Sequence, residues 1–400
     1  MRTPPFPSLT FLAPLALLAL EPPAPSLAAP RGGPVLMHQP TTRFDLAADS
    51  VVVPMKREDG RIIVDVTLDG KGPFPFIFDT GAHGSVMDLA FAREQKLSLG
   101  QEVTVASPSG GGLPGHLTTI GTVGIGGLTL HDLPSVAFDG MPFPKSATSP
   151  RGVLGPYSLS GLLVTLDYPG KRLVFRRGAL PEPDGREVFG WDRARGLPEI
   201  PATVAGQSVR VHLDSGSSGG IALPTDFTAR LPLETPLAHA GYAKAVDRVE
   251  PVTAARLRGA FTIGRYTLDD PTLRFLDIDR DVCNVGAAVL SQFALTIDPA
   301  NARLRLAGPE SGHLEAVPEK PHYGLQLEAL EGSPLKVLAV DAGSAAEKGG
   351  LRSGDQIVRM NGRPVEAIAV DDRLMALRDS TLQVTVKRAD ASLDLTMTLK

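Results

Sequence analysis

Hydrophobic and polar positions change over in short runs along the middle of the chain, which is typical of β-strands. From Val51 onward the pattern predicts strands at 51–55, 61–68 and 74–78, each bounded by Gly, Asp or Pro. Glycine (42 residues) and proline (36 residues) are frequent throughout, which favours short strands and turns over long helices. The sequence therefore predicts a mainly β protein.

The N-terminus has the pattern of an export signal. Arg2 precedes an apolar run at 9–20, and the small-residue stretch 26–29 offers a cleavage point after Ala28. The apolar run is shorter than the roughly 20 residues that span a bilayer. We expect residues 1–28 to be a signal peptide, and the mature chain to lie in a bacterial periplasm or outside the cell without a membrane span. The alternative is an anchor that is never cleaved.

Two stretches rich in proline, glycine and charge divide the rest of the chain. With the lead-in, which we expect to be unstructured, they give the following organisation: lead-in 29–50, first lobe 51–178, connector 179–197, second lobe 198–308, linker 309–321 and C-terminal domain 322–400.

The two lobes repeat one another. Three blocks recur in the same order: 76–82 with 211–217, 125–132 with 263–270, and Gly155, Ser160 and Asp167 with Gly286, Ser291 and Asp298. Their separations of 135, 138 and 131 residues are nearly constant. The chain therefore contains two copies of one β-rich lobe.

Each copy delivers a carboxylate from an apolar strand into a glycine turn. Two lobes related by an approximate two-fold axis would bring Asp79 and Asp214 face to face. Carboxylates about 3 Å apart cannot both ionise cheaply, so they share a proton. One can then act as a base on water while the other donates to a substrate carbonyl, with neither a metal nor a cofactor.

The blocks 79–82 (DTGA) and 214–217 (DSGS) resemble the catalytic loops of aspartic proteases of the retropepsin-like type, with both halves in one chain. The resemblance covers 51–308 and implies a two-lobed β-barrel pseudo-dimer. It makes Asp79 and Asp214 the catalytic pair and has the hydroxyls of Thr80 and Ser215 cross-link the two loops. The remaining loop positions that it implies as support are Gly81, Ala82, Gly216 and Ser217.

The chain departs from this family at several positions. The family packs a hydrophobic-hydrophobic-Gly block behind each loop; 153–155 (VLG) fits this pattern, whereas 284–286 (NVG) fits only partly. His83 replaces a small polar residue, and Gly219-Gly220 loosens the second loop. The Gly-rich segment 107–115 is the candidate for the substrate-covering hairpin, and it lacks the tyrosine of pepsin-like enzymes.

The C-terminal part, 322–400, resembles a small α+β domain, the PDZ domain of the bacterial type, through its block at 344–358 (SAAEKGGLRSGDQIV). In that family, backbone amides of a short loop capture a peptide's C-terminal carboxylate, and the peptide adds as a strand. The resemblance places this site at Tyr323, Gly324, Leu325, Gln326 and Leu327. The segment 371–378 has helical spacing and is expected to line the groove.

Other chemistries find less support in the sequence. The segment 216–220 satisfies G-x-S-x-G, but that motif needs a following helix, and Pro224 breaks one early. The acidic segment 277–288 lacks the glycine and glutamate of a calcium loop. The histidines lack metal-ligand spacing, and Cys283 is expected to be a buried thiol. A net charge of −4 disfavours nucleic acid as a partner.

Together these observations predict an exported aspartic endopeptidase that acts on polypeptides, with a PDZ domain that binds C-termini or regulates access. The alternative is a non-catalytic peptide-binding scaffold with the same lobes. A third hypothesis, a self-processing or dimerising interaction protein, would show as oligomers without turnover.

Overall fold

The fold is known from a computed structural model. It describes residues 43–58, 60–106, 112–139, 141, 149–193, 197–244, 249–277, 282–317, 322–328, 333–369, 372–373, 376–389 and 391–399. Residues 1–42, and with them the predicted signal peptide, lie outside this part of the chain. No helix among the described residues is both long and apolar enough to cross a membrane.

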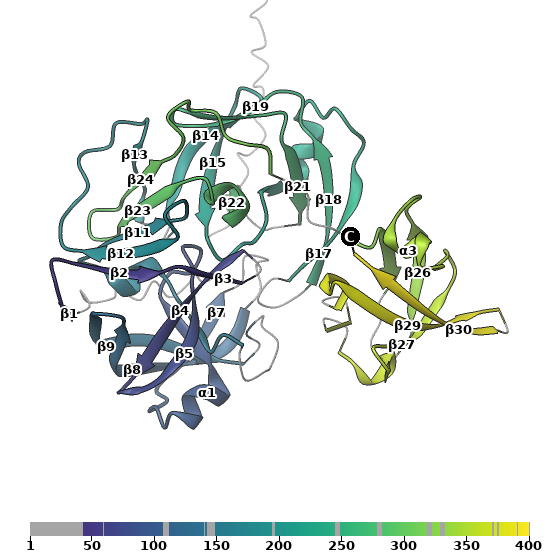
Figure 1. Cartoon of the computed structure of the whole chain (residues 1–400), viewed down its shortest axis with the longest axis horizontal. Helices are drawn as coiled ribbons and strands as arrows, with labels where there is room; N and C mark the ends of the chain where they lie inside the picture. Colours follow the sequence, from purple (N-terminus) through teal and green to yellow (C-terminus); the bar gives the residue numbers. More distant parts are fainter. Residues whose placement is uncertain are drawn as a thin grey trace, which may run out of the picture.

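The described part of the chain is mainly β, as predicted (Figure 1). Its α-helices are short: α1 (Leu89–Glu94), α2 (Ala287–Leu290) and α3 (Ala345–Lys348). Single 3-10 turns occur at Pro156–Leu159, Thr225–Ala229, Val365–Ala367 and Ala376–Arg378. The 3-10 turn at Ala376–Arg378 lies in the segment predicted to be helical, of which Asp371, Met375 and Leu374 lie outside the described residues.

The first lobe is built around one sheet. Its strands in the described residues are β1 (Arg43–Leu46), β3 (Lys56–Glu58), β4 (Arg61–Leu68), β5 (Lys71–Phe78), β6 (Ser85–Asp88), β7 (Glu102–Ala106), β8 (Gly112–Ile125), β9 (Leu128–Phe138) and β10 (Gly152–Leu154). Side chains alternate along the strands, as in β4, where Val64 and Val66 are buried while Asp65 is exposed.

The second lobe repeats this arrangement. Its strands are β14 (Glu199–Val204), β15 (Gln207–Asp214), β16 (Ile221–Pro224), β17 (Ala238–Lys244), β18 (Val249–Arg256), β19 (Ala260–Ile263), β20 (Tyr266–Asp269), β21 (Thr272–Leu276) and β22 (Cys283–Gly286). In both lobes the strand that ends in the aspartate loop pairs in parallel with the strand of the downstream glycine block, β5 with β10 and β15 with β22.

A central sheet joins the lobes through their repeated strands. It contains β2 (Ser50–Pro54), β11 (Leu163–Asp167), β12 (Arg172–Arg176), β13 (Val188–Gly190), β23 (Ala294–Asp298) and β24 (Arg303–Ala307). β11 pairs antiparallel with β23, and Thr165 faces its repeat counterpart Thr296, with 2.9 Å between the hydroxyl oxygens. Because equivalent residues of the two copies pair with each other, the approximate two-fold axis passes between these threonines.

One hydrophobic core runs through both lobes and the central sheet. It includes Phe76 and Phe78 from the first lobe, Phe261 and Phe275 from the second, and Leu166 from the central sheet, each at most 1% exposed. The lobes therefore pack as one unit. The PDZ region has a separate core.

The lead-in was predicted to be unstructured, but part of it forms strands. Residues 43–46 form β1, which pairs with β9, and Ser50 already belongs to β2. The strand signal was hidden because β1 alternates exposed and half-buried positions and buries no fully apolar face.

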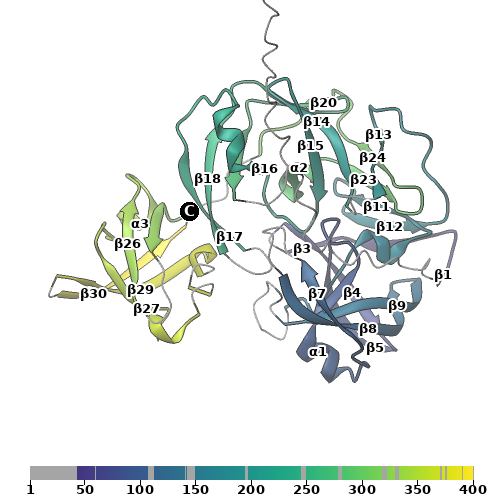
Figure 2. The ribbon, with the colours of Figure 1, turned by 180° about the vertical axis from the view of Figure 1, so that it is seen from behind.

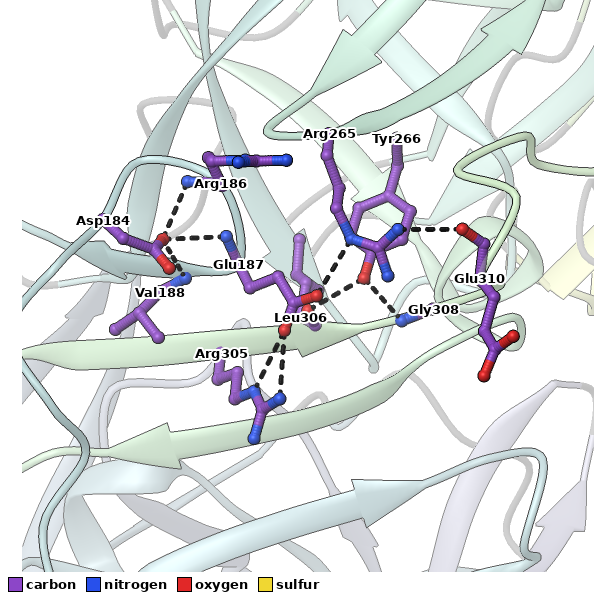
Figure 3. Close-up of polar contacts among 10 residues, drawn as sticks. All are labelled: Asp184, Arg186, Glu187, Val188, Arg265, Tyr266, Arg305, Leu306, Gly308 and Glu310. Carbon is purple, nitrogen blue, oxygen red and sulfur yellow. Dashed lines mark hydrogen bonds and ion pairs between the residues drawn. The ribbon is translucent and has the colours of Figure 1, made fainter.

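The connector also has more structure than its composition suggests. Within it β13 pairs with β24, and Trp191 is buried in the shared core. Figure 3 shows how its turn is held: Asp184 Oδ1 accepts from the backbone N–H groups of residues 186, 187 and 188, at 2.8 to 2.9 Å. Glu187 pairs with Arg265 at 2.9 Å and Arg305 at 3.0 Å. The charged residues of the connector therefore hold it in a fixed conformation against β24 and the second lobe.

The linker begins as part of the second lobe. Leu314 is buried against the core, and Glu315 exchanges two hydrogen bonds with the side chain of Gln292. Beyond it the C-terminal domain forms a sheet of β25 (Leu325–Glu328), β26 (Leu335–Val340), β27 (Gln356–Met360), β28 (Arg363–Pro364), β29 (Thr381–Arg388) and β30 (Ala391–Thr398). Seen from behind, this domain stands beside the second lobe (Figure 2).

Candidate active site

The two aspartate loops meet on the approximate two-fold axis through a reciprocal set of hydrogen bonds. The backbone N–H of Thr80 donates to Ser215 Oγ, and the N–H of Ser215 donates to Thr80 Oγ1, both at 2.9 Å. The Thr80 hydroxyl donates to the carbonyl of Leu213 at 2.5 Å, and the Ser215 hydroxyl donates to that of Phe78 at 2.9 Å. Thr80 and Ser215 are fully buried, so these bonds lock one loop onto the other.

Asp79 and Asp214 lie next to each other at this junction. The N–H of Gly216 donates to both, at 3.0 Å to Asp79 Oδ1 and 2.9 Å to Asp214 Oδ1, and the two carboxyls are hydrogen-bonded to each other. Asp79 Oδ1 also accepts from the N–H of Gly81 at 2.7 Å, and Asp214 Oδ1 from that of Ser217 at 2.9 Å. Asp79 Oδ1 thus accepts from backbone donors of both loops, whereas the two backbone donors to Asp214 Oδ1 come from its own loop.

The glycines of the loops are required by close approach. A Cβ at Gly81 would lie 2.6 Å from Asp214 Oδ1, and one at Gly216 would collide with the carboxyl of Asp79. Gly155, directly after β10, and Gly286, at the end of β22, are required for the same reason: a Cβ there would collide with the carbonyl oxygen of Ala82 and with that of Gly219, respectively.

The environment favours a single proton on the pair. The pKa of Asp79 is raised from 3.8 to about 8; burial is the largest cause, and the negative charge of Asp214 is the second. The N–H of Gly81 and the positive charge of Arg61 act in the opposite direction and are smaller. Near neutral pH the site therefore contains a protonated Asp79 beside a second carboxyl, which is one acid and one acceptor within hydrogen-bond reach.

Asn284 is a residue of this site that the sequence reasoning missed. Its Nδ2 donates to Asp214 Oδ2 at 3.0 Å, while its Oδ1 is buried and has no hydrogen-bond partner among the described residues. At the equivalent position of the first lobe stands Val153, which cannot donate. The signal was the poor fit of 284–286 to the apolar block. Asn284 therefore distinguishes the two carboxyls, which the repeat alone would leave equivalent.

Two further side chains reach the site from outside the aspartate loops. Arg61, at the start of β4, donates through Nε to the carbonyl of Gly216 at 2.8 Å and so ties the first lobe to the second loop. Tyr168, which directly follows β11, is buried, and the charges of both aspartates act on it. Burial raises the pKa of its hydroxyl, which has no hydrogen-bond partner in the described part of the chain. Single residues of this kind carried no sequence signal.

Two departures from the family pattern, His83 and the candidate substrate-covering hairpin, can be placed in the structure. The ring of His83 stacks on Tyr157 with 4.5 Å between centroids, and the Tyr157 hydroxyl accepts from Trp191 Nε1 at 3.0 Å. His83 thus anchors the first loop to the connector. The candidate hairpin is the β7–β8 pair, in which Ala106 faces Gly112; residues 107–111 lie outside the described part.

The G-x-S-x-G segment does not form a nucleophile elbow. Residues 221–224, after the G-x-S-x-G segment, form β16, whereas a nucleophile elbow leads into a helix. The described residues contain no cluster of acidic, histidine or cysteine side chains suited to a metal ion. Cys283 is fully buried in β22, as expected.

In the C-terminal domain the predicted peptide site forms the sheet edge. Tyr323 is buried and donates through its hydroxyl to the carbonyl of Asp379 at 2.7 Å; Gly324 adopts a positive φ of 68°. Leu325, Gln326 and Leu327 belong to β25, the outermost strand, which pairs with β26 on one side only.

Comparison with known proteins agrees with this architecture. A family model described as aspartyl protease matches residues 64–156, and one described as PDZ domain matches residues 314–387. The chain carries an aspartyl protease domain followed by a PDZ domain. Among solved structures, a crystal structure of the HtrA3 PDZ domain bound to a phage-derived ligand (FGRWV) is 26% identical, covers 20% of this chain and 86% of that one, and has a TM-score of 0.18. No curated protein matches the chain.

The aspartyl protease match lies within the first lobe. It includes Asp79, Thr80, Gly81, Ala82 and the glycine block that ends at Gly155. The second lobe has the same parallel pairing of its aspartate strand with its glycine-block strand and the same aspartate turn, and this second loop completes the arrangement at the two-fold axis. The family resemblance and the order of the two domains are therefore confirmed.

Proposed function

We propose that the protein is an aspartic endopeptidase in which Asp79 and Asp214 share one proton and activate water. The observation that carries the proposal is the Gly216 N–H that donates to both carboxyls, together with the reciprocal Thr80–Ser215 contacts that fix the loops. A pair held in this way needs no large rearrangement before it acts.

The chemistry follows from the unequal surroundings of the two carboxyls. Asp79, held protonated by burial, donates its proton to the carbonyl oxygen of the scissile peptide. Asp214, which accepts from Asn284 and two backbone N–H groups, takes a proton from water as the water oxygen attacks the carbonyl carbon. The resulting tetrahedral intermediate collapses when Asp214 gives its proton to the leaving nitrogen and a hydroxyl of the intermediate returns a proton to Asp79, so that the peptide bond breaks and the pair is restored.

The substrate class is an extended polypeptide, held between the lobes. The PDZ domain binds peptide C-termini and recruits chains or regulates access to the pair. Export to a periplasm or the cell exterior is part of the proposal and rests on the pattern of residues 1–28.

A non-catalytic peptide-binding scaffold is the alternative. It keeps the lobes and the PDZ domain but has no turnover. The raised pKa of Asp79 favours the enzyme, because strongly shifted carboxyls cluster at catalytic sites.

The test is hydrolysis of a reduced, unfolded protein by the mature chain, by Asp79→Asn and by Asp214→Asn, with and without a pepstatin-type inhibitor. Asp226→Asn is the control, because Asp226 lies in an exposed 3-10 turn and its side chain is 70% exposed. We expect the wild type and the control to cleave and both pair variants to lose at least about 1,000-fold in rate. Hydrolysis that survives in either folded pair variant contradicts the proposal, and an inactive, folded wild type supports the scaffold.

A further inference from the structure

The free edge of the PDZ sheet is covered by the second lobe. β25 pairs with β26 on one side, and the N–H of Leu327 points to the other side, where a peptide strand would add. That N–H donates to the hydroxyl of Tyr242 at 3.2 Å. Tyr242 belongs to β17, which is itself the outermost strand of the second lobe's sheet.

The contact extends beyond this hydrogen bond. The ring of Tyr242 packs against the PDZ core, and Gly241 lies beside His322, which precedes the predicted carboxylate loop. The strand pairing of β17 shifts register between His239 and Tyr242, and the two rings meet edge to face at 5.0 Å. Such an irregularity turns a side chain out of the regular alternation of a strand.

Burial supports the same view. Tyr242 is only half-buried as a residue, but burial raises the pKa of its hydroxyl, and the N–H of Leu327 acts in the opposite direction. In Figures 1 and 2 β17 lies on the side of the second lobe that faces the PDZ domain. An edge strand with an unpaired row of N–H groups is normally covered or paired, and here one lobe supplies the cover.

We propose that β17 of the second lobe is an internal ligand of the PDZ edge, with Tyr242 as its anchor, and that a peptide C-terminus must displace it in order to bind. The competition, though not the contact, rests on the peptide-binding role given to the PDZ domain above.

Comparison of the two lobes identifies the part of the second lobe that the PDZ domain contacts. β17 and β18 form the hairpin that follows the aspartate loop of the second lobe, in the place that β7 and β8 occupy in the first. The β8–β9 turn at Gly126 corresponds to the β19–β20 turn at Gly264, which fixes this alignment. A peptide at the PDZ edge would therefore release a strand of the second lobe's hairpin, so that occupancy of the PDZ domain is communicated to the protease lobes.

The first test measures the contact in the full mature chain by hydrogen exchange of the backbone amides of residues 325–328. Tyr242→Phe removes the acceptor of the Leu327 N–H, and Tyr242→Ala removes the ring as well. We expect exchange to accelerate roughly fivefold in the first variant and more in the second. Tyr266→Phe is the matched control, because it removes a tyrosine hydroxyl from β20 of the second lobe without touching β17 or the PDZ domain. Unchanged exchange in Tyr242→Ala, or equal acceleration in Tyr266→Phe, overturns the contact.

The second test measures the competition. Fluorescein-labelled pentapeptides with a free carboxylate, ending in Val, Leu, Ile or Phe, are titrated against the full chain and followed by anisotropy. We expect Tyr242→Ala to bind at least one of them roughly tenfold more tightly than the wild type, because the edge no longer has to be vacated. Equal affinities overturn the competition. Faster exchange with no peptide binding by any variant leaves the contact in place and refutes the peptide-binding role.

Discussion

The buried proton of Asp79 makes the stability of the protease lobes depend on pH in a specific way. Below about pH 4 the carboxyl is protonated in both the folded and the unfolded chain, so it contributes no pH dependence. Between 3.8 and about 8 the unfolded chain ionises while the folded chain keeps its proton, so stability falls as pH rises. At 1.36 kcal/mol per pKa unit, this group costs about 4 kcal/mol at pH 7. Partial exposure of Asp79 makes that value an upper limit.

Asp79→Asn removes the titration and keeps the shape. We expect the variant to be more stable than the wild type at pH 7 by up to about 4 kcal/mol, and the difference to vanish near pH 4. For lobes of this size that corresponds to a rise in melting temperature of roughly 8 °C at pH 7. The assay is thermal unfolding at half-unit steps from pH 4 to 8, followed by circular dichroism.

The comparison with Asp214→Asn separates the two causes of the shift. It removes the neighbouring charge but leaves the burial, which is the larger cause, so the pH dependence should shrink without disappearing. Curves for the wild type and Asp79→Asn that run parallel from pH 4 to 8 would refute the reasoning, because they would mean that Asp79 ionises normally in the folded chain.

Three further predictions follow from individual contacts. Thr80→Val removes both hydrogen bonds of a buried hydroxyl and leaves the Ser215 N–H unpaired. The free energy of unfolding of the lobes, measured in urea, should therefore fall by about 3 kcal/mol; a fall below about 1 kcal/mol would show that these bonds do not hold the loops together. Asn284→Val introduces the residue type found at the equivalent position of the first lobe. It should lower kcat about tenfold with little change in KM, measured with a quenched peptide, and an unchanged kcat would show that Asn284 has no part in catalysis. Asp355→Ala breaks the paired bonds to Arg388 at 2.7 and 2.8 Å and should destabilise the PDZ domain by about 3 kcal/mol, which calorimetry would detect. The same pair holds the pKa of Asp355 below its usual value, so its contribution should fade as the pH drops below about 4, and an unchanged acid limb would contradict this.

The repeat made much of the site predictable. Duplicated aspartate turns at a nearly constant separation imply a two-fold axis, and the structure places both turns on it, with Thr80 bonded to Ser215. Apolar runs bounded by turn residues were also predicted well, as 61–68 coincides with β4. Each aspartate turn and the strand before it follow from a short local pattern, and that pattern occurs in both lobes.

The remainder depends on contacts between distant segments. Asn284 lies 70 residues from Asp214 in the chain, and its role comes from the parallel pairing of β15 with β22, which periodicity does not reveal. The strand β13 has three residues, Val188–Gly190, which is too short for a strand pattern to be recognised in the sequence; its pairing with β24 and the ion pair of Glu187 with Arg305 hold it in place. The cover that Tyr242 gives to the PDZ edge likewise depends on how two domains pack.

The central claim is that one proton is shared by Asp79 and Asp214 and that this pair performs the hydrolysis. The most direct measurement is kcat/KM for an internally quenched peptide from pH 3 to 9, with the wild type and both single Asn variants. The account predicts a bell-shaped profile whose upper limb falls near pH 8, where Asp79 loses its proton, and no measurable activity in either variant. A profile that rises through pH 8 without a decline, or an Asn variant that retains the wild-type profile, would contradict it.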